Sequence, residues 1–201
     1  MTETLVCLSN LHVEALNLSE GFTQLSPEAI ERMFDPTQIW LGPREALETD
    51  ERYRQLVSYV VVRHGDQVLT YRRTPKGGES RLHGRVSVGV GGHWNVGDVF
   101  STDGAIDAMA TLRRAFDREL AEEIGTSTPE RVQVVGVIKE SGNAVSRVHL
   151  GVVIECWLPD TEVVVHDPGL IDPKFVARTD LSRMSDNMET WSSGLIAYLN
   201  S

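Results

Sequence analysis

The sequence predicts an α/β fold in which helices cover a mixed β-sheet, and three observations lead to this prediction. Several segments are rich in β-branched residues with period-two patterning, which is typical of strands. Other segments carry apolar residues at three- and four-residue steps, which is typical of amphipathic helices. The two kinds of segment do not alternate regularly, as they would in a doubly wound fold. We therefore expect a mixed sheet with helices on its faces.

The clearest strand signal is "LVSYVVVRH" at 56–64, which is followed by Gly65 and Asp66 and then by "QVLTYRR" at 67–73. Two strand-like runs joined by such a turn indicate a β-hairpin. Further strands are expected at 85–90, 131–140 and 146–158, and the run "EVVVH" at 162–166 is a candidate for another.

The longest helix is expected between Ser101 and Gly125, where apolar residues recur at helical spacing. Asp103 is the expected N-terminal cap, and Gly125 is the expected end. A short helix is expected after Ser26, because serine is a good N-cap and Pro27 suits the first helical position. A closing helix at 186–199 is expected to pack on the sheet.

Length and composition favour one globular domain. The chain has 201 residues, of which 41% are hydrophobic and 24% charged, enough for one well-buried core. We expect residues 1–50 to form an N-terminal extension packed on a main domain at 51–201. The formal net charge of -10 argues against binding a nucleic acid polymer. An anionic substrate would need a local basic patch or a metal ion.

Cysteine usage and apolar runs bear on the compartment. Cys7 and Cys156 are too few for a disulfide framework, and they lack the spacing of a metal site. The N-terminus lacks the features of a signal peptide, and no run approaches the roughly 20 apolar residues of a membrane span. We therefore expect a cytoplasmic protein without membrane contact.

The segment "RELAEEIG" at 118–125 concentrates acidic residues on one side of the long helix. Positions three and four apart share a helix face, so Glu119, Glu122 and Glu123 converge and repel one another. A hard divalent cation such as Mg²⁺ or Mn²⁺ prefers carboxylate oxygen and would relieve that repulsion. Arg118 can fork onto a neighbouring carboxylate and fix its rotamer.

The same segment resembles the Nudix hydrolase superfamily, whose motif is G-x5-E-x7-R-E-U-x-E-E-x-G-U, where U is bulky and aliphatic. The last position is Thr126 here. Strict spacing would put Ala110 at the first acid. We prefer "GGHWNVGD", with Gly92 as the glycine and Asp98 as the acid, followed by 19 residues (99–117) where the motif has 7.

The resemblance extends to "ETDERYRQLVSYVVV", "RLHGRVSVGVGGHWN", "VHLGVVIE" and "METWS", which are similar to a branch described only as predicted Nudix-type phosphoesterases. It covers the chain from about Trp40 to the C-terminus. It implies an α/β/α sandwich around a mixed sheet and hydrolysis of a nucleoside diphosphate linked to another moiety.

The expected catalytic residues follow from this resemblance and from the charge pattern. Mg²⁺ or Mn²⁺ would be held by Glu119, Glu122, Glu123 and Asp98, with Asp98 acting through water or through Arg118. A divalent ion neutralises phosphoryl oxygens and acidifies water. For the general base, we expect Glu140, with Glu189 and Glu155 as rivals. The catalytic set is Glu119, Glu122, Arg118 and Glu140.

Substrate binding is expected from a basic loop and from the glycine-rich turn. The glycines allow the backbone to bend beside a phosphate, and His93 follows them. Trp94, Tyr59 or Trp40 could stack on a base, although packing is a sufficient explanation for four tryptophans in 201 residues. The expected substrate-binding residues are Arg72, Arg73, Lys76, Arg81, Arg85, Gly91, Gly92 and His93.

Two other functions share this fold. One is an isomerase resembling isopentenyl diphosphate isomerase, which would need a cysteine next to the glycine turn, where "GVGGHWN" has none. The other is a non-catalytic module that binds a nucleotide, which loss of the acidic cluster would favour. The expected partner is a small nucleotide-derived diphosphate. A homodimer is compatible with the resemblance, although no exposed apolar stripe requires one.

Overall fold

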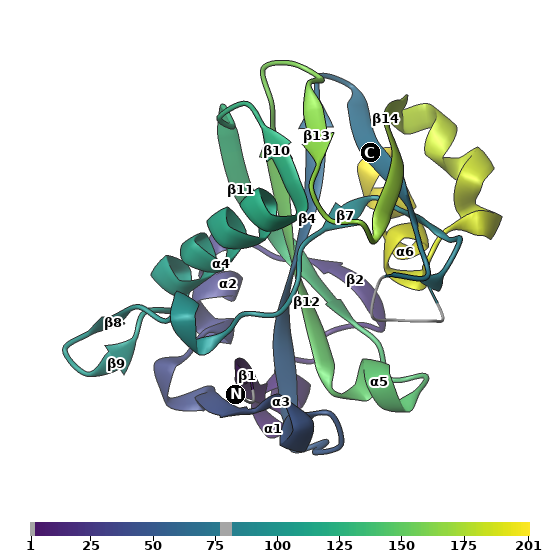
Figure 1. Ribbon diagram of the computed structural model, residues 1–201. Helices are drawn as coiled ribbons and strands as arrows, with labels where there is room; N and C mark the ends of the chain where they lie inside the picture. Colours follow the sequence, from purple (N-terminus) through teal and green to yellow (C-terminus); the bar gives the residue numbers. More distant parts are fainter. Residues whose placement is uncertain (1–2, 77–81) are drawn as a thin grey trace. The chain divides into compact units, whose positions relative to one another are not determined.

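The structure is a computed structural model that describes residues 3–76 and 82–201. Strands and helices both contribute to it, as the sequence predicts (Figure 1). Within the described residues, one sheet has ten strands, and its main path runs β14-β5-β4-β12-β11-β2, with β1, β3, β6 and β7 attached to it. These strands are β1 (Thr4–Ser9), β2 (Gly21–Gln24), β3 (Ile39–Pro43), β4 (Tyr53–His64), β5 (Gln67–Arg73), β6 (Val86–Ser87), β7 (Gly89–Val90), β11 (Arg131–Lys139), β12 (His149–Trp157) and β14 (Leu170–Ala177).

Two small two-stranded sheets and several helices complete the described chain. The small sheets pair β8 (Ser101–Thr102) with β9 (Ala105–Ile106), and β10 (Ile124–Thr126) with β13 (Val163–Val165). The α-helices are α1 (Asn10–Ala15), α2 (Pro27–Met33), α3 (Arg44–Leu47), α4 (Ala108–Glu123), α5 (Ala144–Arg147) and α6 (Thr190–Leu199). The 3-10 helices given for the described residues are η1 (Pro36–Gln38), η3 (Val96–Asp98) and η4 (Arg178–Asn187).

The chain divides into two compact units. The first unit contains residues 1–59, 92–118 and 134–153, and the second contains 60–91, 119–133 and 154–201. The predicted division into an extension at 1–50 and a domain at 51–201 stays a prediction.

In the first unit, β1 lies between two antiparallel partners. Cys7 faces Trp40 of β3 on one side and Gln55 of β4 on the other. Residues 5–8 of β1 are all buried, so both faces of the strand are covered, and neither Leu5 nor Leu8 is exposed to solvent. In the same unit, β2 pairs with β11. The cap of α2 is as expected, because the Ala29 amide donates to the Ser26 hydroxyl at 3.3 Å.

In the second unit, the predicted hairpin of β4 and β5 is confirmed by the antiparallel pair Arg63 and Val68. β14 pairs with the other side of β5, with a register shift between Ile171 and Lys174. The run at 162–166 does contain a strand, β13, and the closing helix is α6. The predicted strand at 85–90 is divided into β6 and β7, which pair with β5 and β4 respectively.

The long helix begins later than the sequence predicts. Residues 101–106 form the β8–β9 hairpin, which extends from the chain just before α4 (Figure 1). Asp103 and Gly104 occupy its turn with φ of 53° and 83°. Asp103 is therefore not the helix cap. Asp107 takes that place, since its Oδ1 accepts from the Ala110 amide at 2.9 Å.

The predicted end of the long helix holds, but one other boundary is wrong. α4 ends at Glu123, two residues before Gly125, which itself lies in β10 opposite Val164 without a left-handed conformation. β12 begins at His149, since the residues before it form α5, whose cap is Asn143. The Asn143 side chain accepts from the Ser146 amide at 3.0 Å, which is a local bond that competes with strand pairing.

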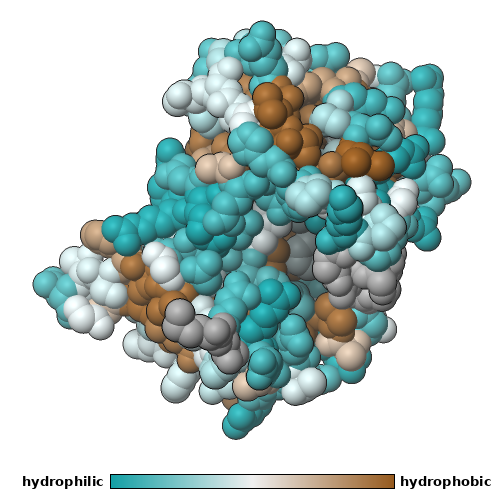
Figure 2. All heavy atoms as spheres, viewed as in Figure 1, coloured by the Kyte–Doolittle hydropathy of each residue, from teal (hydrophilic) through white to brown (hydrophobic). Residues whose placement is uncertain are grey.

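The surface is mostly hydrophilic on the face that Figure 2 shows, with apolar residues in small patches. Such scattered apolar exposure is ordinary for a folded protein. No helix in the part of the chain that the structure describes is long and apolar enough to cross a bilayer.

Candidate functional site

In the first unit, the glycine-rich segment is tied to β4. The Ser58 amide donates to the Gly92 carbonyl, and the Trp94 amide donates to the Leu56 carbonyl, both at 2.9 Å. Gly91 has a φ of 135°, a conformation that side chains rarely adopt, so glycine is needed at this turn. The residues before and after His93, Gly92 and Trp94, are therefore both hydrogen-bonded to β4, which fixes the backbone of His93.

Of the two roles left open for the aromatic residues, stacking on a base or packing, the structure shows packing for two of them. Trp94 is fully buried, stacks on Phe34 at 5.5 Å between ring centroids, and donates from Nε1 to the Ser58 hydroxyl at 2.9 Å. Tyr59 is also buried. Both belong to the core, whereas Trp40 is half exposed.

Asp98 and Arg118 form a two-pronged ion pair within the first unit. Arg118 Nε donates to Asp98 Oδ1 at 2.9 Å, and Arg118 Nη2 donates to Asp98 Oδ2 at 2.8 Å. The Asn95 amide also donates to Oδ2 at 2.9 Å, and Asp98 is buried. Both carboxylate oxygens of Asp98 therefore have partners. Of the two routes predicted for Asp98, through water or through Arg118, the structure shows the contact with Arg118. Arg118 Nη2 also donates to the His93 carbonyl at 2.9 Å.

The side chain of His93 contacts His149, which lies at the start of β12. Their Nε2 atoms are 3.0 Å apart, and the ring centroids are 5.1 Å apart. His149 Nδ1 lies 2.7 Å from the Val145 carbonyl oxygen. Burial, then the charges of His149, Arg44 and Arg118, lower the pKa of His93 to about 3.

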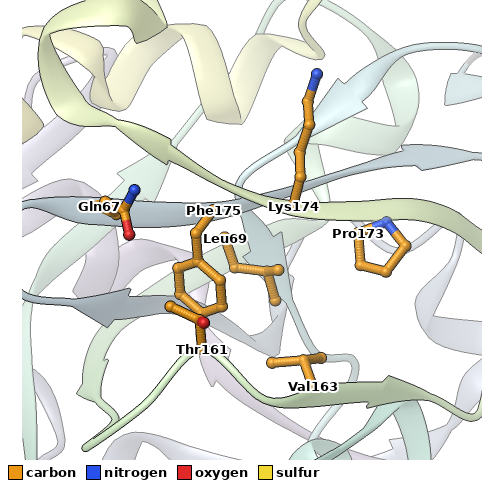
Figure 3. Close-up of a pocket in the computed structure, with 7 residues that line it drawn as sticks. All are labelled: Gln67, Leu69, Thr161, Val163, Pro173, Lys174 and Phe175. Carbon is orange, nitrogen blue, oxygen red and sulfur yellow. The ribbon is translucent and has the colours of Figure 1, made fainter.

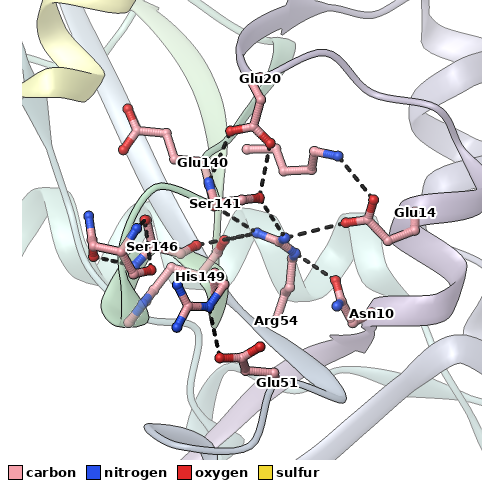
Figure 4. Close-up of polar contacts among 12 residues, drawn as sticks. Asn10, Glu14, Glu20, Glu51, Arg54, Glu140, Ser141, Ser146 and His149 are labelled. Atoms are coloured by element: carbon pink, nitrogen blue, oxygen red, sulfur yellow. Dashed lines mark hydrogen bonds and ion pairs between the residues drawn. The ribbon is translucent and has the colours of Figure 1, made fainter.

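Glu140, the predicted general base, lies at the end of β11 beside a buried arginine, Arg54 (Figure 4). The Arg54 guanidinium reaches the backbone at both ends of the loop that Glu140 begins. The Glu140 side chain points away from Arg54 in Figure 4. The acceptors of Arg54 are Asn10 Oδ1, Glu14 Oε1, Ser141 Oγ and the carbonyls of Glu140, Ser146 and His149.

In the second unit, the last turn of α4 carries the three motif glutamates. Leu120 and Ile124 are buried and anchor this turn. Glu119 is also buried, Glu122 is exposed, and Glu123 is half-buried. The glutamates therefore occupy the border between core and solvent, where a bound ion could be reached from outside.

Glu123 has a buried carboxylate oxygen, Oε2, with no hydrogen-bond partner among the described residues. Burial first, and then the negative charge of Asp167, raise the pKa of Glu123 to about 7. The loop that carries Asp167 is fixed on the helix end, because the amides of His166 and Asp167 donate to the Glu123 carbonyl at 2.9 and 3.2 Å. Asp167 is not among the residues that the sequence predicts for the site, and nothing in the spacing of residues 160–170 indicates it.

The unpartnered Glu123 Oε2 bears on whether a divalent cation fits at this end of α4. A buried carboxylate beside a second acidic group is unfavourable unless a proton or a cation compensates it. Carboxylate oxygens are the ligands that Mg²⁺ and Mn²⁺ prefer, so this donor set fits such an ion. Residues 3–76 and 82–201 contain no group of three or more His, Cys, Asp or Glu side chains already gathered in ligand geometry.

The predicted basic residues of the second unit lie in different surroundings. Arg73 stacks over Tyr71 at 5.4 Å, and its charge opposes the rise in the pKa of Glu123. Arg72 Nη1 donates to the Gly84 carbonyl at 3.3 Å, and Arg85 Nη1 donates to the Asp186 carbonyl at 3.0 Å. Lys76 is exposed, and Arg81 lies outside the described residues.

The two rival bases, Glu155 and Glu189, are both buried. Glu155 forms an ion pair with Arg63 at 2.6 Å. Glu189 Oε1 accepts from the Ser87 hydroxyl at 2.5 Å and from the Ser192 hydroxyl at 3.1 Å. The charges of Glu189 and Glu123 both act on the Tyr71 phenol and, with burial, raise its pKa. Glu189 therefore shares its surroundings with the acidic end of α4.

A hollow of about 340 Å³ lies elsewhere in the second unit, and Figure 3 shows its lining. None of the predicted site residues lines it. We do not place the reaction there. The lining residues are Gln67, Leu69, Thr161, Val163, Pro173, Lys174 and Phe175.

Comparison with known proteins identifies the family. No family model matches the sequence. Protein YmaB of Bacillus subtilis (strain 168) is 34% identical over 157 residues, which cover 76% of this chain and 74% of YmaB. The crystal structure of Tm1382, assigned as a Nudix hydrolase, matches 98% of both chains with 26% identity and a TM-score of 0.77. This chain belongs to the Nudix superfamily.

A more distant Nudix structure shows the fold alone. The NUDIX domain of Shewanella oneidensis NrtR, solved with ADP ribose, is 15% identical with a TM-score of 0.53, over 73% of this chain and 86% of that one. The α/β fold with a large sheet and helices that the sequence predicts is thus confirmed as the Nudix fold. The Nudix motif residues at 118–125 therefore place the candidate active site at the end of α4.

Proposed function

We propose that this Nudix protein is a metal-dependent hydrolase that cleaves a diphosphate linkage in a small nucleotide-derived substrate by attack of water at phosphorus. The observation that carries the proposal is the end of α4. Three glutamates follow one another at helical spacing there, and Glu123 Oε2 is buried without a partner among the described residues. A surface helix face would not need to bury an unpaired carboxylate oxygen.

Mg²⁺ or Mn²⁺ would be held by Glu119, Glu122 and Glu123, and Asp167 joins this set because it lies against Glu123. When bound, such an ion supplies neutralisation of the diphosphate charge and acidification of water. Asp98 acts through Arg118, whose rotamer it fixes with two hydrogen bonds. Arg118 precedes Glu119 in the chain, so a fixed Arg118 also helps to fix the helix that carries the glutamates.

Two glutamates are candidates for the group that accepts the proton of the attacking water. Glu140 is the residue that the sequence favours. Glu189 gains support from its surroundings, since it shares the neighbourhood of Tyr71 with Glu123. In hydrolysis, the water oxygen bonds to phosphorus, the base takes a proton, and the phosphorus–oxygen bond to the leaving group breaks. Glu140→Gln and Glu189→Gln would separate the two, because loss of the base lowers kcat by about 10²-fold or more.

The negative diphosphate is proposed to contact Arg73, whose charge already acts at the acidic end of α4. Arg72, Lys76, Arg81 and Arg85 remain proposed contacts, as do Gly91 and Gly92. The experiment that identifies the substrate also distinguishes Mg²⁺ from Mn²⁺, because it is run with each metal.

The testing experiment measures phosphate or nucleotide release from a panel of substrates, in Mg²⁺ and in Mn²⁺. The panel contains nucleotide sugars, dinucleoside polyphosphates, NADH, ADP-ribose, coenzyme A and nucleoside triphosphates. Glu122→Gln is the test variant. Asp117→Asn is the matched control, because Asp117 is an exposed acid of the same helix that pairs with Arg113.

We expect turnover that Glu122→Gln abolishes and Asp117→Asn retains, with Mn²⁺ affinity by calorimetry following the same order. Equal metal affinity in the wild type and Glu122→Gln would overturn the metal assignment. Ligand binding without turnover would instead favour a non-catalytic nucleotide-binding module.

A further inference from the structure

The contact between His93 and His149 requires a defined arrangement of protons. The two Nε2 atoms are 3.0 Å apart, a hydrogen-bond distance. Two lone pairs at that distance would repel, and so would two N–H groups. One of the two nitrogens must therefore donate and the other must accept.

The direction of that hydrogen bond follows from the backbone. His149 Nδ1 lies 2.7 Å from the Val145 carbonyl oxygen, which can only accept. His149 therefore carries its proton on Nδ1. In its neutral form His149 has one N–H, so its Nε2 is an acceptor and His93 Nε2 is the donor. The remaining nitrogen of His93, Nδ1, then has a lone pair. A charged His149 would carry both protons and reverse this hydrogen bond, with the His93 proton then on Nδ1.

The surroundings keep His93 neutral. Its ring is largely buried, and positive charges at Arg44 and Arg118 lie near enough to disfavour a third cation. Both histidines are also fixed through their backbones. Arg118 Nη2 donates to the His93 carbonyl at 2.9 Å, and Arg54 Nη1 donates to the His149 carbonyl at 3.2 Å.

Arg54 makes this anchor rigid. It is only 2% exposed, and the same Nη1 atom also reaches the Ser146 carbonyl at 3.3 Å (Figure 4). A buried guanidinium with this many acceptors holds the chain before β12 in one conformation. The His149 ring is therefore positioned by the fold before any ligand arrives.

We propose that His149 is a positioning residue that locks His93 in the Nε2–H tautomer, so that His93 offers Nδ1 to a hydrogen-bond donor of the substrate. Nδ1 makes no hydrogen bond with any residue that the structure describes. The donor is a hydroxyl or amino group, such as a sugar hydroxyl of a nucleotide, and not a phosphoryl oxygen, which only accepts. This inference rests on the proposed function for the identity of the substrate, and it revises the phosphate contact that the sequence suggests for His93.

The first experiment is nitrogen-15 NMR of the histidine rings in the full metal-free chain at pH 8. The chain has six histidines, and a His93→Gln variant assigns the His93 signals by their absence. We expect a protonated Nε2 and an unprotonated Nδ1 for His93, with the opposite pattern for His149. A His93 ring protonated at Nδ1 would overturn the proposal.

Inorganic phosphate is the second probe, in the same spectra. We expect phosphate to leave His93 Nδ1 unprotonated at every concentration tested. Conversion of His93 to its imidazolium form, or to the Nδ1–H tautomer, would show that it binds phosphate and would contradict the proposed donor contact.

The third experiment uses His149→Ala, which removes the acceptor of the His93 Nε2 proton. We expect the His93 signals to shift to a mixture of tautomers, and KM for the substrate found by the panel to rise about tenfold with a smaller change in kcat. His64→Ala is the control, because His64 also places Nδ1 near a carbonyl, that of Leu158 at 3.1 Å. Unchanged His93 signals in His149→Ala would refute the positioning role.

Failure of this inference is distinguishable from failure of the proposed function. The tautomers are measured without metal or turnover, so they are expected to be identical in the wild type and Glu122→Gln. If hydrolysis is absent while the tautomers are as stated, the hydrolase proposal fails and the arrangement of His93 stands. If hydrolysis is present with His93 protonated at Nδ1, only the inference fails.

Discussion

Arg118 donates two parallel hydrogen bonds to Asp98, from Nε to Oδ1 at 2.9 Å and from Nη2 to Oδ2 at 2.8 Å. The Asp98 side chain is 4% exposed and that of Arg118 is 26% exposed, so the pair is largely shielded from water. Such a two-pronged pair fixes the angle of the guanidinium as well as its position. It joins the glycine-rich segment to α4 within the first unit.

Asp98→Asn tests this pair. The amide keeps the shape of the side chain but turns one acceptor into a donor that faces Arg118. We expect a loss of about 2 kcal/mol in the free energy of unfolding, measured with urea. The matched change Asp117→Asn breaks an exposed pair with Arg113 on the same helix and is expected to cost less than about 0.5 kcal/mol. Equal losses of unfolding free energy in the two variants would show that the buried pair stabilises the fold no more than the exposed pair does.

The pH dependence of stability tests the neutral state of His93. Its pKa in the folded protein is about 3, below the ordinary value of 6.5, so the unfolded chain takes up a proton first as the pH falls. The folded state is therefore destabilised by acid between pH 6.5 and 3, with a slope of about 1.4 kcal/mol per pH unit from this group. Above pH 6.5 the contribution is constant.

The measurement for His93 is urea unfolding at pH 7, 6 and 5, in the wild type and in His93→Gln. We expect the variant to lose stability less steeply on acidification, because it lacks the group that titrates. His64→Gln is the control for the loss of a histidine outside this contact. Parallel curves for the wild type and His93→Gln would mean that His93 takes up its proton equally well in the folded state.

Glu155→Gln tests whether Glu155 is structural. Glu155 and Arg63 lie 2.6 Å apart with side chains 4% and 14% exposed. Removing one charge leaves the other buried without its partner, so we expect a loss of about 3 kcal/mol in the free energy of unfolding. Asp180→Asn, which breaks an exposed pair with Arg183, is expected to cost less than about 0.5 kcal/mol. A folded Glu155→Gln protein that has lost turnover but not stability would make Glu155 a catalytic candidate again.

The fold was predictable where local signals agreed. The hairpin of β4 and β5 and the cap of α2 depend on residues close in the sequence, and both are confirmed. The predicted start of α4 was wrong. Asp103 was expected to be the cap, but the pairing of β8 with β9, which the short run at 101–106 did not reveal, delays the helix, and Asp107 is the cap.

The candidate site was predictable only in part. Its motif residues are close together in the sequence, whereas the residues that contact them come from distant parts of the chain. The glutamates of α4 and the role of Arg118 as a partner of a carboxylate follow from spacing along the helix. Asp167 is brought to Glu123 by hydrogen bonds between residues more than 40 positions apart, and His149 reaches His93 across 56 positions. For Trp94 the sequence left packing and base stacking open, because a buried tryptophan and a stacking tryptophan have the same sequence signal, and its burial agrees with packing.

Asp167→Asn tests the residue that the sequence analysis missed. The amide oxygen can still accept from the Gly169 amide, which now donates to Asp167 Oδ1 at 2.7 Å, so the loop is expected to keep its shape. The substitution removes one negative charge next to Glu123. If Asp167 helps to hold the metal, Mn²⁺ affinity by calorimetry should fall about tenfold or more. Without metal, the same change relieves the repulsion with Glu123, so the unfolding temperature should rise slightly.

Asp172→Asn is the matched control for that experiment. Asp172 is exposed, lies in β14 of the same unit, and has a φ of 53°, which asparagine tolerates. It changes the net charge by the same amount away from Glu123. We expect it to leave both Mn²⁺ affinity and unfolding temperature unchanged. If the two variants lose metal affinity equally, the effect is one of net charge, and Asp167 is only a neighbour of Glu123 and not a part of the metal site.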